Sequence, residues 1–233
     1  MIKKILTTDP SYKQMTMAYN KIEAVLAVGL YICVIVLYLA AGYIGMISGS
    51  NLIAIFANVL LAAMVLVIIR IRKQKFSTVG FTLSHFKRSL IIGAVAGLIL
   101  SICANIIPTI LSGGQWMGFD SIPWNFFYML VIIAFIEELV FRGYIQTRLY
   151  GAIKSDAAAV IVGSVLFMGM HIPFQLFNRN DGNLIDFFAA NSFWLLTTLV
   201  MHLLFNFLYR KYNSLISPTI CHFLVNFGST LFG

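Results

Sequence analysis

The carboxyl and imidazole side chains in the C-terminal half of this chain stand inside or at the end of hydrophobic stretches. Glu137 and Glu138 follow an uncharged apolar run, and His171 and His222 lie in two later runs. A carboxyl group at membrane depth costs about 3 kcal/mol or more unless neighbouring groups satisfy it. A carboxylate can act as a general base, and an imidazole can position or stabilise a reacting group. The pattern therefore indicates a buried site built from an acid and two imidazoles.

The spacing of the acidic motif separates the two glutamates. Glu138 and Arg142 are four residues apart, so they share one face of a helix and can pair. Glu137 points elsewhere, because neighbouring residues are about 100° apart around a helix axis. We therefore predict that Glu138 and Arg142 form a structural pair and that Glu137 faces the site. The alternative is a salt bridge at a helix end, with both glutamates reaching water.

The later motifs supply imidazole and amide groups. His222 and Asn226 lie on one helix face, four residues apart, and His171 stands two residues before Pro173, which we expect to end or bend its helix. These groups and Glu137 could hold a water molecule, or Glu137 and the two histidines could bind a metal such as zinc. The HExxH spacing of soluble zinc peptidases is absent, so no local motif demands a metal.

The composition requires these groups to be positioned by membrane helices. Of the 233 residues, 60% are hydrophobic and only 10% are charged, against about 25% charged in soluble domains. Apolar runs of about 20 residues, the length that crosses about 30 Å of hydrocarbon, recur along the chain. We predict an all-α, polytopic membrane helix bundle of about seven transmembrane helices, forming a single integral membrane domain over residues 1–233. The predicted segments are 24–47, 51–71, 88–111, 124–145, 156–176, 184–209 and 215–231.

The basic residues alternate between the connectors in a way that predicts topology. Lysine and arginine gather in the N-terminal tail and in every second connector. In the other connectors, Arg179 is the only basic residue of these two types. The positive-inside rule then places the N-terminus in the cytoplasm and the C-terminus outside. This distribution also explains the net charge of +8 without a nucleic-acid partner, which would need base concentrated on a folded surface.

Three motifs together resemble those of a known family. In order they are EExxxR at residues 137–142, FxxxH at 167–171 and HxxxN at 222–226. This succession is similar to that of the CPBP family, the CAAX protease and bacteriocin-processing (Abi) intramembrane peptidases. The resemblance covers residues 124–230 as a catalytic helical core and leaves residues 1–123 as accessory N-terminal helices.

The resemblance implies hydrolysis of a peptide bond within or beside the membrane. By this resemblance Glu137 would activate the attacking water, His171 would help to position it, and His222 and Asn226 would stabilise the oxyanion. Zinc, held by Glu137, His171 and His222, and a metal-free glutamate mechanism are both compatible with the family. Glu138 and Arg142 would support the structure of this site.

The expected substrate is a membrane-associated peptide or protein, in a bacterial cell membrane, with a role in bacteriocin self-immunity or peptide processing. CAAX prenyl-protein processing is the alternative substrate class. A non-catalytic membrane scaffold or immunity protein is the alternative that is not an enzyme, while a transporter would predict inverted repeats that the sequence lacks. The oligomeric state stays open, because a GxxxG pattern at Gly93 and Gly97 serves packing within one chain as well as dimerisation.

Overall fold

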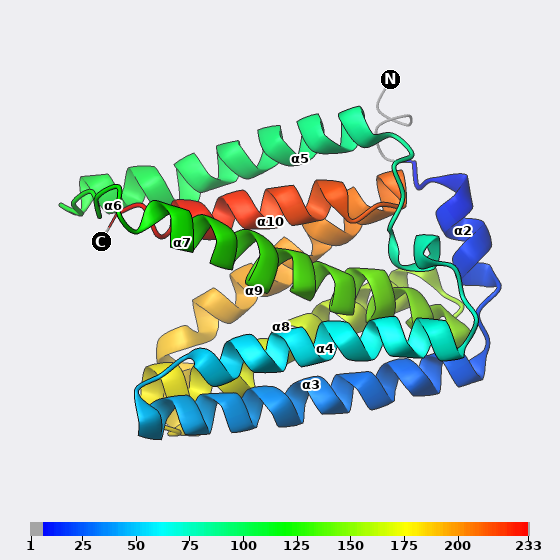
Figure 1. The fold of residues 1–233 in the computed structure, drawn as a ribbon, viewed down its shortest axis with the longest axis horizontal. Coiled ribbons are helices and arrows are strands. Elements are labelled where there is room, and N and C mark those ends of the chain that lie inside the picture. Colours follow the sequence, from blue (N-terminus) through cyan, green and yellow to red (C-terminus); the bar gives the residue numbers. More distant parts are fainter. Residues whose placement is uncertain (1–6, 233) are drawn as a thin grey trace.

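The computed structural model describes residues 7–232 as a bundle of helices that run up and down along one direction (Figure 1). Within that range the only strand-like pairing is an isolated bridge between Trp116 and Phe232. The helical elements are α2 (Pro10–Met17), α3 (Lys21–Ser48), α4 (Leu52–Ile71), η1 (Phe76–Val79), α5 (Phe86–Ser101), η2 (Ile102–Ile106), α6 (Ile107–Leu111), α7 (Ile122–Phe127), η3 (Tyr128–Phe135), η4 (Glu138–Gln146), η5 (Leu149–Gly151), α8 (Asp156–Asn180), α9 (Leu184–Tyr212) and α10 (Ile216–Gly228). The predicted all-α polytopic bundle is confirmed.

In the described part of the chain, six helices are long and apolar enough to cross a membrane. They are Lys21–Ser48, Leu52–Ile71, Phe86–Leu111, Ile122–Gly151, Asp156–Asn180 and Leu184–Tyr212. The protein is therefore an integral membrane protein. The seventh predicted segment also forms a helix, α10, but its 13 residues rise only about 20 Å. The residues that follow α10 continue to the far end of the bundle. There the backbone N–H of Met117 donates to the carbonyl of Leu231.

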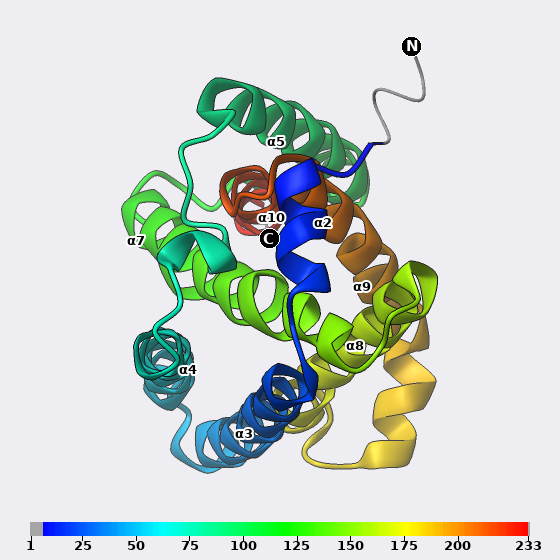
Figure 2. The same cartoon turned by 90° about the vertical axis from the view of Figure 1, so that its right-hand side faces the viewer.

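One end of the bundle gathers the N-terminal segment and the connectors rich in lysine and arginine. The short helix α2 lies across this end, which we call the basic end (Figure 2). Successive membrane helices alternate in direction, so the opposite end carries the α3–α4, α6–α7 and α8–α9 connections and the C-terminus (Figure 1). The alternation of basic and base-poor connectors in the sequence therefore corresponds to two opposite ends of the molecule.

Several basic residues at this end are structural. Arg148 is fully buried, and its guanidinium donates to the backbone carbonyls of Thr78 and Gly143 and to the side chain of Gln74. It also lies over the ring of Tyr144, with 4.4 Å between Cζ and the ring centroid. Arg148 thus ties the connector between α4 and α5 to the central helix. Positive charge here therefore helps to fix the shape of this end of the bundle.

The helix of residues 122–151 runs through the middle of the bundle, in contact with α3, α4, α8, α9 and α10 (Figure 2). Much of it, η3 and η4, is π-helical rather than α-helical. The sequence predicted an ordinary helix here, since no residue pattern distinguishes the two forms. π-Helical turns recur at functional sites, where they place side chains that a regular helix would direct elsewhere.

Pro173 does not end its helix, because α8 continues through it to Asn180. A membrane helix tolerates the lost backbone hydrogen bond where neighbouring groups satisfy the freed carbonyl. The next residue, Phe174, packs closely on α3 at Gly42, where an added Cβ would lie 2.9 Å from the carbonyl oxygen of Phe174. The continuous α8 keeps His171 inside the bundle rather than at a helix end.

The GxxxG pattern of α5 packs against α10 of the same chain. A Cβ on Gly93 would meet the backbone of Ser217, and a Cβ on Gly97 would lie 2.9 Å from the Cα atom of Cys221. Cys221 is next to His222. The small residues therefore seat the helix that carries His222, and they provide no argument for a dimer.

We expect Gly97→Ala to destabilise the protein by about 2 kcal/mol, because the added methyl group meets backbone atoms that cannot move independently. Gly29→Ala is the matched control, because no atom lies within 4 Å of a Cβ added there. Thermal unfolding in detergent measures the difference, and equal unfolding temperatures for the two variants would contradict this packing account.

Candidate functional site

The predicted site residues come from three helices that meet in the interior. Glu137 lies between η3 and η4, near the middle of the 30-residue helix Ile122–Gly151. His171 is on α8, and His222 and Asn226 are on α10. The acidic residue is therefore held at membrane depth by a buried helix, while the imidazoles approach from separate helices.

Both imidazoles face the same carboxylate oxygen. The Nε2 atom of His171 is 3.7 Å from Oε2 of Glu137, and Nε2 of His222 is 3.9 Å from that same atom. These separations are longer than direct hydrogen bonds, so neither imidazole Nε2 atom bonds directly to the carboxylate. Within residues 7–232, Oε2 of Glu137 is buried and makes no hydrogen bond. The three atoms thus surround a point at which a small polar molecule can be held.

The second nitrogen of each imidazole is fixed by a hydrogen bond. Nδ1 of His171 lies 2.8 Å from the carbonyl oxygen of Phe167, and Nδ1 of His222 lies 2.9 Å from Oε1 of Glu138. A carbonyl and a carboxylate only accept hydrogen bonds, so each Nδ1 carries the proton and donates. In the neutral rings, Nε2 is then the unprotonated nitrogen. The backbone of α8 and the second glutamate thereby orient both reactive nitrogens toward Glu137.

Glu138 and Arg142 form a buried ion pair beside this point. Oε1 of Glu138 accepts a 2.9 Å hydrogen bond from Nη1 of Arg142, and both side chains are 0% exposed. The Arg142 guanidinium lies over two rings, with Cζ 3.8 Å from the centroid of Phe167 and 5.0 Å from that of Phe205. Glu138 therefore connects a cation held between aromatic rings to the imidazole of His222.

Aromatic side chains line the imidazoles. His171 packs edge-on against Phe167 with ring centroids 4.7 Å apart, and it also contacts Trp194 at 5.9 Å. His222 stacks on Phe205 with centroids 4.9 Å apart. Such rings fix the imidazole orientation and reduce access of bulk water, which strengthens electrostatic interactions at the site.

The remaining predicted residues take different positions. Asn226 is half-buried one turn along α10 from His222, so the two share a helix face. His202 is fully buried and its Nε2 atom lies 3.2 Å from Oε1 of Gln146, with its ring packed against Phe167. His202 thus packs between helices, outside the cluster around Glu137.

The sequence analysis missed two tyrosines near Glu137, one on the accessory helix α3 and one on the central helix. Tyr38 of α3 and Tyr128 lie within electrostatic reach of Glu137. The Tyr38 hydroxyl donates a 2.7 Å hydrogen bond to Oδ1 of Asn58 on α4. The only signal in the sequence was that Tyr38 and Asn58 are polar residues within two apolar runs, and no motif connects them. The N-terminal helices therefore contribute to the surroundings of the carboxylate.

The donor set Glu137, His171 and His222 has the chemistry that zinc prefers, namely carboxylate oxygen and imidazole nitrogen. Within residues 7–232, no group of three or more His, Cys, Asp or Glu side chains converges closely enough to hold a metal ion. The geometry described here therefore leads to no catalytic step that depends on a metal.

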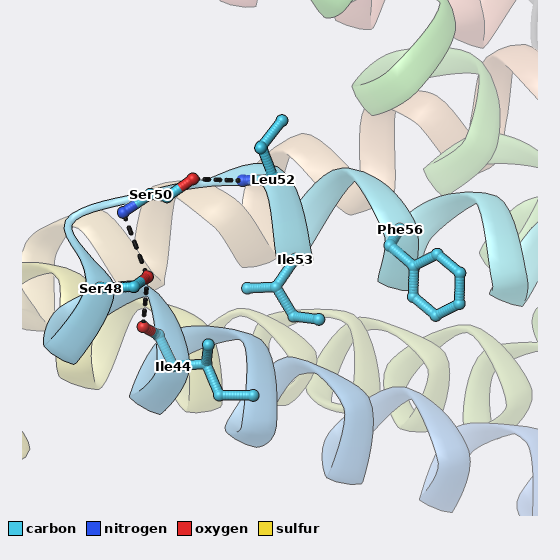
Figure 3. Close-up of a pocket in the computed structure, with 6 residues that line it drawn as sticks. All are labelled: Ile44, Ser48, Ser50, Leu52, Ile53 and Phe56. Atoms are coloured by element: carbon cyan, nitrogen blue, oxygen red, sulfur yellow. Dashed lines mark hydrogen bonds between the residues drawn. The ribbon is translucent and has the colours of Figure 1, made fainter.

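A surface cavity of about 390 Å³ lies away from this cluster, at the turn between α3 and α4 (Figure 3). Its polar groups are Ser48 and Ser50, which are engaged in local hydrogen bonds: Ser48 donates to the carbonyl of Ile44, and Ser50 accepts from the backbone N–H of Leu52. It has no carboxylate or imidazole lining. The cavity therefore lacks the carboxylate and imidazole groups that the interior cluster brings together.

Fold and site together define a polytopic membrane protein with a buried carboxylate–imidazole cluster. The sequence model of one family, described as Type II CAAX prenyl endopeptidase Rce1-like, matches residues 119–228. That segment belongs to the CPBP family, a family of CAAX-type intramembrane proteases, and the resemblance seen in the three motifs is confirmed. No match was found among curated proteins.

Proposed function

We propose that this protein is an intramembrane endopeptidase that uses Glu137 to activate water. The observation that carries the proposal is the convergence of two imidazole Nε2 atoms, at 3.7 and 3.9 Å, on the buried Oε2 atom of Glu137. A water molecule there would donate one hydrogen bond to Glu137 and one to His171. Its lone pair would then be directed at a substrate carbonyl.

The reaction follows from these roles. Glu137 takes a proton as the water oxygen bonds to the peptide carbonyl carbon, which forms a tetrahedral oxyanion. The protonated Glu137 then gives that proton to the amide nitrogen as the C–N bond breaks, so the carboxylate is regenerated. His171, held by its hydrogen bond to Phe167, fixes the direction of the water throughout.

The oxyanion would be stabilised from α10. The side-chain amide of Asn226 is a hydrogen-bond donor, and His222 becomes a second donor at Nε2 when it is protonated. The Glu138 carboxylate accepts the hydrogen bond of Nδ1 and so keeps the His222 ring oriented toward the site. Removing one such donor typically costs a factor of about 10² to 10³ in rate.

The substrate we propose is a peptide or a membrane protein that reaches the cluster from the bilayer, with peptide processing or bacteriocin self-immunity as the role. CAAX prenyl-protein processing is the alternative that the Rce1-like match supports. We place the protein in a bacterial cell membrane with its N-terminus in the cytoplasm, and the gathering of lysine and arginine at the basic end supports that orientation.

The test is cleavage of membrane-tethered peptides, with and without a farnesyl group, by the purified protein in lipid nanodiscs. We expect cleavage by the wild type, a loss of about 100-fold or more in His171→Ala, and a similar loss in Asn226→Ala. A zinc chelator is expected to leave the rate unchanged, because Glu137 and the histidines suffice for the steps above.

Each part of this assay has a result that would contradict part of the proposal. Loss of activity on chelation, restored by added zinc, would replace the metal-free mechanism with a metal-assisted one. Cleavage of the farnesylated peptides alone would assign the alternative substrate class. If peptides remain intact with the wild type and all variants while the protein still acts in its host, a scaffold role is correct and the cluster is structural.

A further inference from the structure

One arginine close to the Glu137 cluster has no counter-ion in the described part of the chain. Arg179 is exposed near the end of α8, at the end of the bundle opposite the basic end (Figure 1). The ion pairs among residues 7–232 do not include it. Asp181 and Asp186 follow it in the sequence, and the Asp186 carboxylate accepts instead from the side chain of Asn183. The charge of Arg179 is therefore not balanced by a paired carboxylate of this chain.

Two hydrogen bonds and an aromatic ring hold the Arg179 guanidinium in place. Its Nε atom donates a 2.9 Å bond to Oε1 of Gln175, one turn earlier on α8, and its Nη1 atom donates a 3.0 Å bond to Oδ1 of Asn191 on α9. Its Cζ atom lies 4.3 Å from the ring centroid of Trp194. Asn191 is itself fixed, because its Nδ2 atom donates to the carbonyl of Phe187. A guanidinium ordered in this way loses little freedom when it binds a ligand.

The guanidinium keeps donors for a ligand. Arginine has five N–H donors, and the two bonds to Gln175 and Asn191 use one on Nε and one on Nη1. Two donors on Nη2 and one on Nη1 are left, and both partners so far are neutral amides. A planar guanidinium with free donors on two nitrogens matches a carboxylate, which accepts two parallel hydrogen bonds. The chemistry of the position therefore favours a carboxylate ligand.

Trp194 connects this guanidinium to the Glu137 cluster. Its ring centroid is 5.9 Å from that of His171 and 4.3 Å from Cζ of Arg179, so the guanidinium carbon is no more than about 10 Å from the centre of the imidazole. His171, Gln175 and Arg179 also follow one another at four-residue intervals along one side of α8. An extended peptide advances about 3.3 Å per residue, so about three residues cover this distance.

We propose that Arg179 determines substrate specificity by binding a carboxylate about three residues from the cleaved bond. This inference rests on the proposed peptidase function. The carboxylate accepts from Nη1 and Nη2 of Arg179 while the peptide carbonyl lies at the Glu137 cluster, and it comes from an acidic side chain or from the C-terminus of the substrate. A lipid phosphate has the same charge, but the contact of Trp194 with both Arg179 and His171 favours the substrate.

The experiment moves one glutamate along otherwise uncharged, membrane-tethered peptides, with glutamine copies as the neutral set. The full-length protein in lipid nanodiscs cleaves them, and mass spectrometry locates the cleaved bond. We expect that bond to move with the glutamate, about three residues away, and kcat/KM to exceed that of the glutamine copies about tenfold, as one charged hydrogen bond provides. Peptides that end in a free carboxylate or a carboxamide distinguish a terminal carboxylate from a side chain.

Arg179→Gln should remove the preference for glutamate. Arg70→Gln is the matched control, because Arg70 is likewise an exposed arginine in the last turn of its helix but lies at the basic end. It should keep the wild-type preference. Equal cleavage of charged and neutral peptides of both sets by the wild type would overturn the proposal. A loss in Arg179→Gln that is equal for charged and neutral peptides would also overturn it, since Arg179 would then only support the packing of α8 and α9.

Binding of the intact peptides to Glu137→Gln separates this inference from the proposed function. A preference for the charged peptides that depends on Arg179, without cleavage by the wild type, would support the carboxylate site and contradict the peptidase function. Cleavage by the wild type with no preference at either stage would support the peptidase function and contradict the carboxylate site. If Arg179→Gln loses only the retention of phosphatidylglycerol in native mass spectrometry, Arg179 binds a lipid phosphate and the proposal is wrong.

Discussion

Glu137→Gln is expected to reduce peptide hydrolysis about 10³-fold, within the range that general-base catalysis provides, while the helix bundle stays intact. Glutamine has the same shape as glutamate but cannot accept the proton of the attacking water. The two Nε2 atoms of His171 and His222 would still surround the position, so substrate binding should persist. Steady-state kinetics with a cleavable tethered peptide should therefore show a large fall in kcat and a small change in KM.

The stability of the same variant separates catalysis from structure. Because Oε2 of Glu137 is buried without a hydrogen bond in the described chain, replacing it removes no hydrogen bond of that atom. The unfolding temperature of Glu137→Gln should equal or exceed that of the wild type. A variant that unfolds early, or one that cleaves at the wild-type rate, would be incompatible with Glu137 as the general base.

Much of the architecture follows from one strong local signal. Apolar runs of about 20 residues permit few structures other than membrane helices, since backbone groups in lipid must be satisfied within the segment. The fixed four-residue spacings likewise place Glu138 with Arg142, and His222 with Asn226, whatever the rest of the fold does. These features depend on a single helix, so the sequence is sufficient to predict them.

The features that the sequence did not predict depend on contacts between helices. Tyr38 and Asn58 come from helices with no recognisable motif, and only the packing of α3 and α4 brings the Tyr38 hydroxyl near Glu137. The sequence also did not indicate the π-helical form of η3 and η4 or the continuation of α8 past Pro173. Local propensity is a weak guide where tertiary packing decides the outcome.

Glu138→Gln, the same change one residue further along, is expected to have the opposite signature and to destabilise the protein by about 3–5 kcal/mol. The carboxylate of Glu138 is fully buried and accepts hydrogen bonds from Arg142 and His222, each at 2.9 Å. Removing its charge leaves the Arg142 guanidinium buried without a counter-ion, the costly case for a buried pair. Chemical or thermal unfolding in micelles, run beside Glu137→Gln, measures the contrast between adjacent residues.

A double variant tests whether the loss of stability comes from the unpaired Arg142 guanidinium. In Glu138→Gln/Arg142→Met the buried charge is absent, and the methionine side chain can pack between Phe167 and Phe205, where the guanidinium lies. Replacing both members of a buried ion pair by groups of similar volume is often close to neutral. Most of the lost stability should therefore return, while hydrolysis stays low because His222 lacks the carboxylate that orients Nδ1. If the double variant is less stable than Glu138→Gln alone, Arg142 supports the fold through the aromatic rings and not through Glu138.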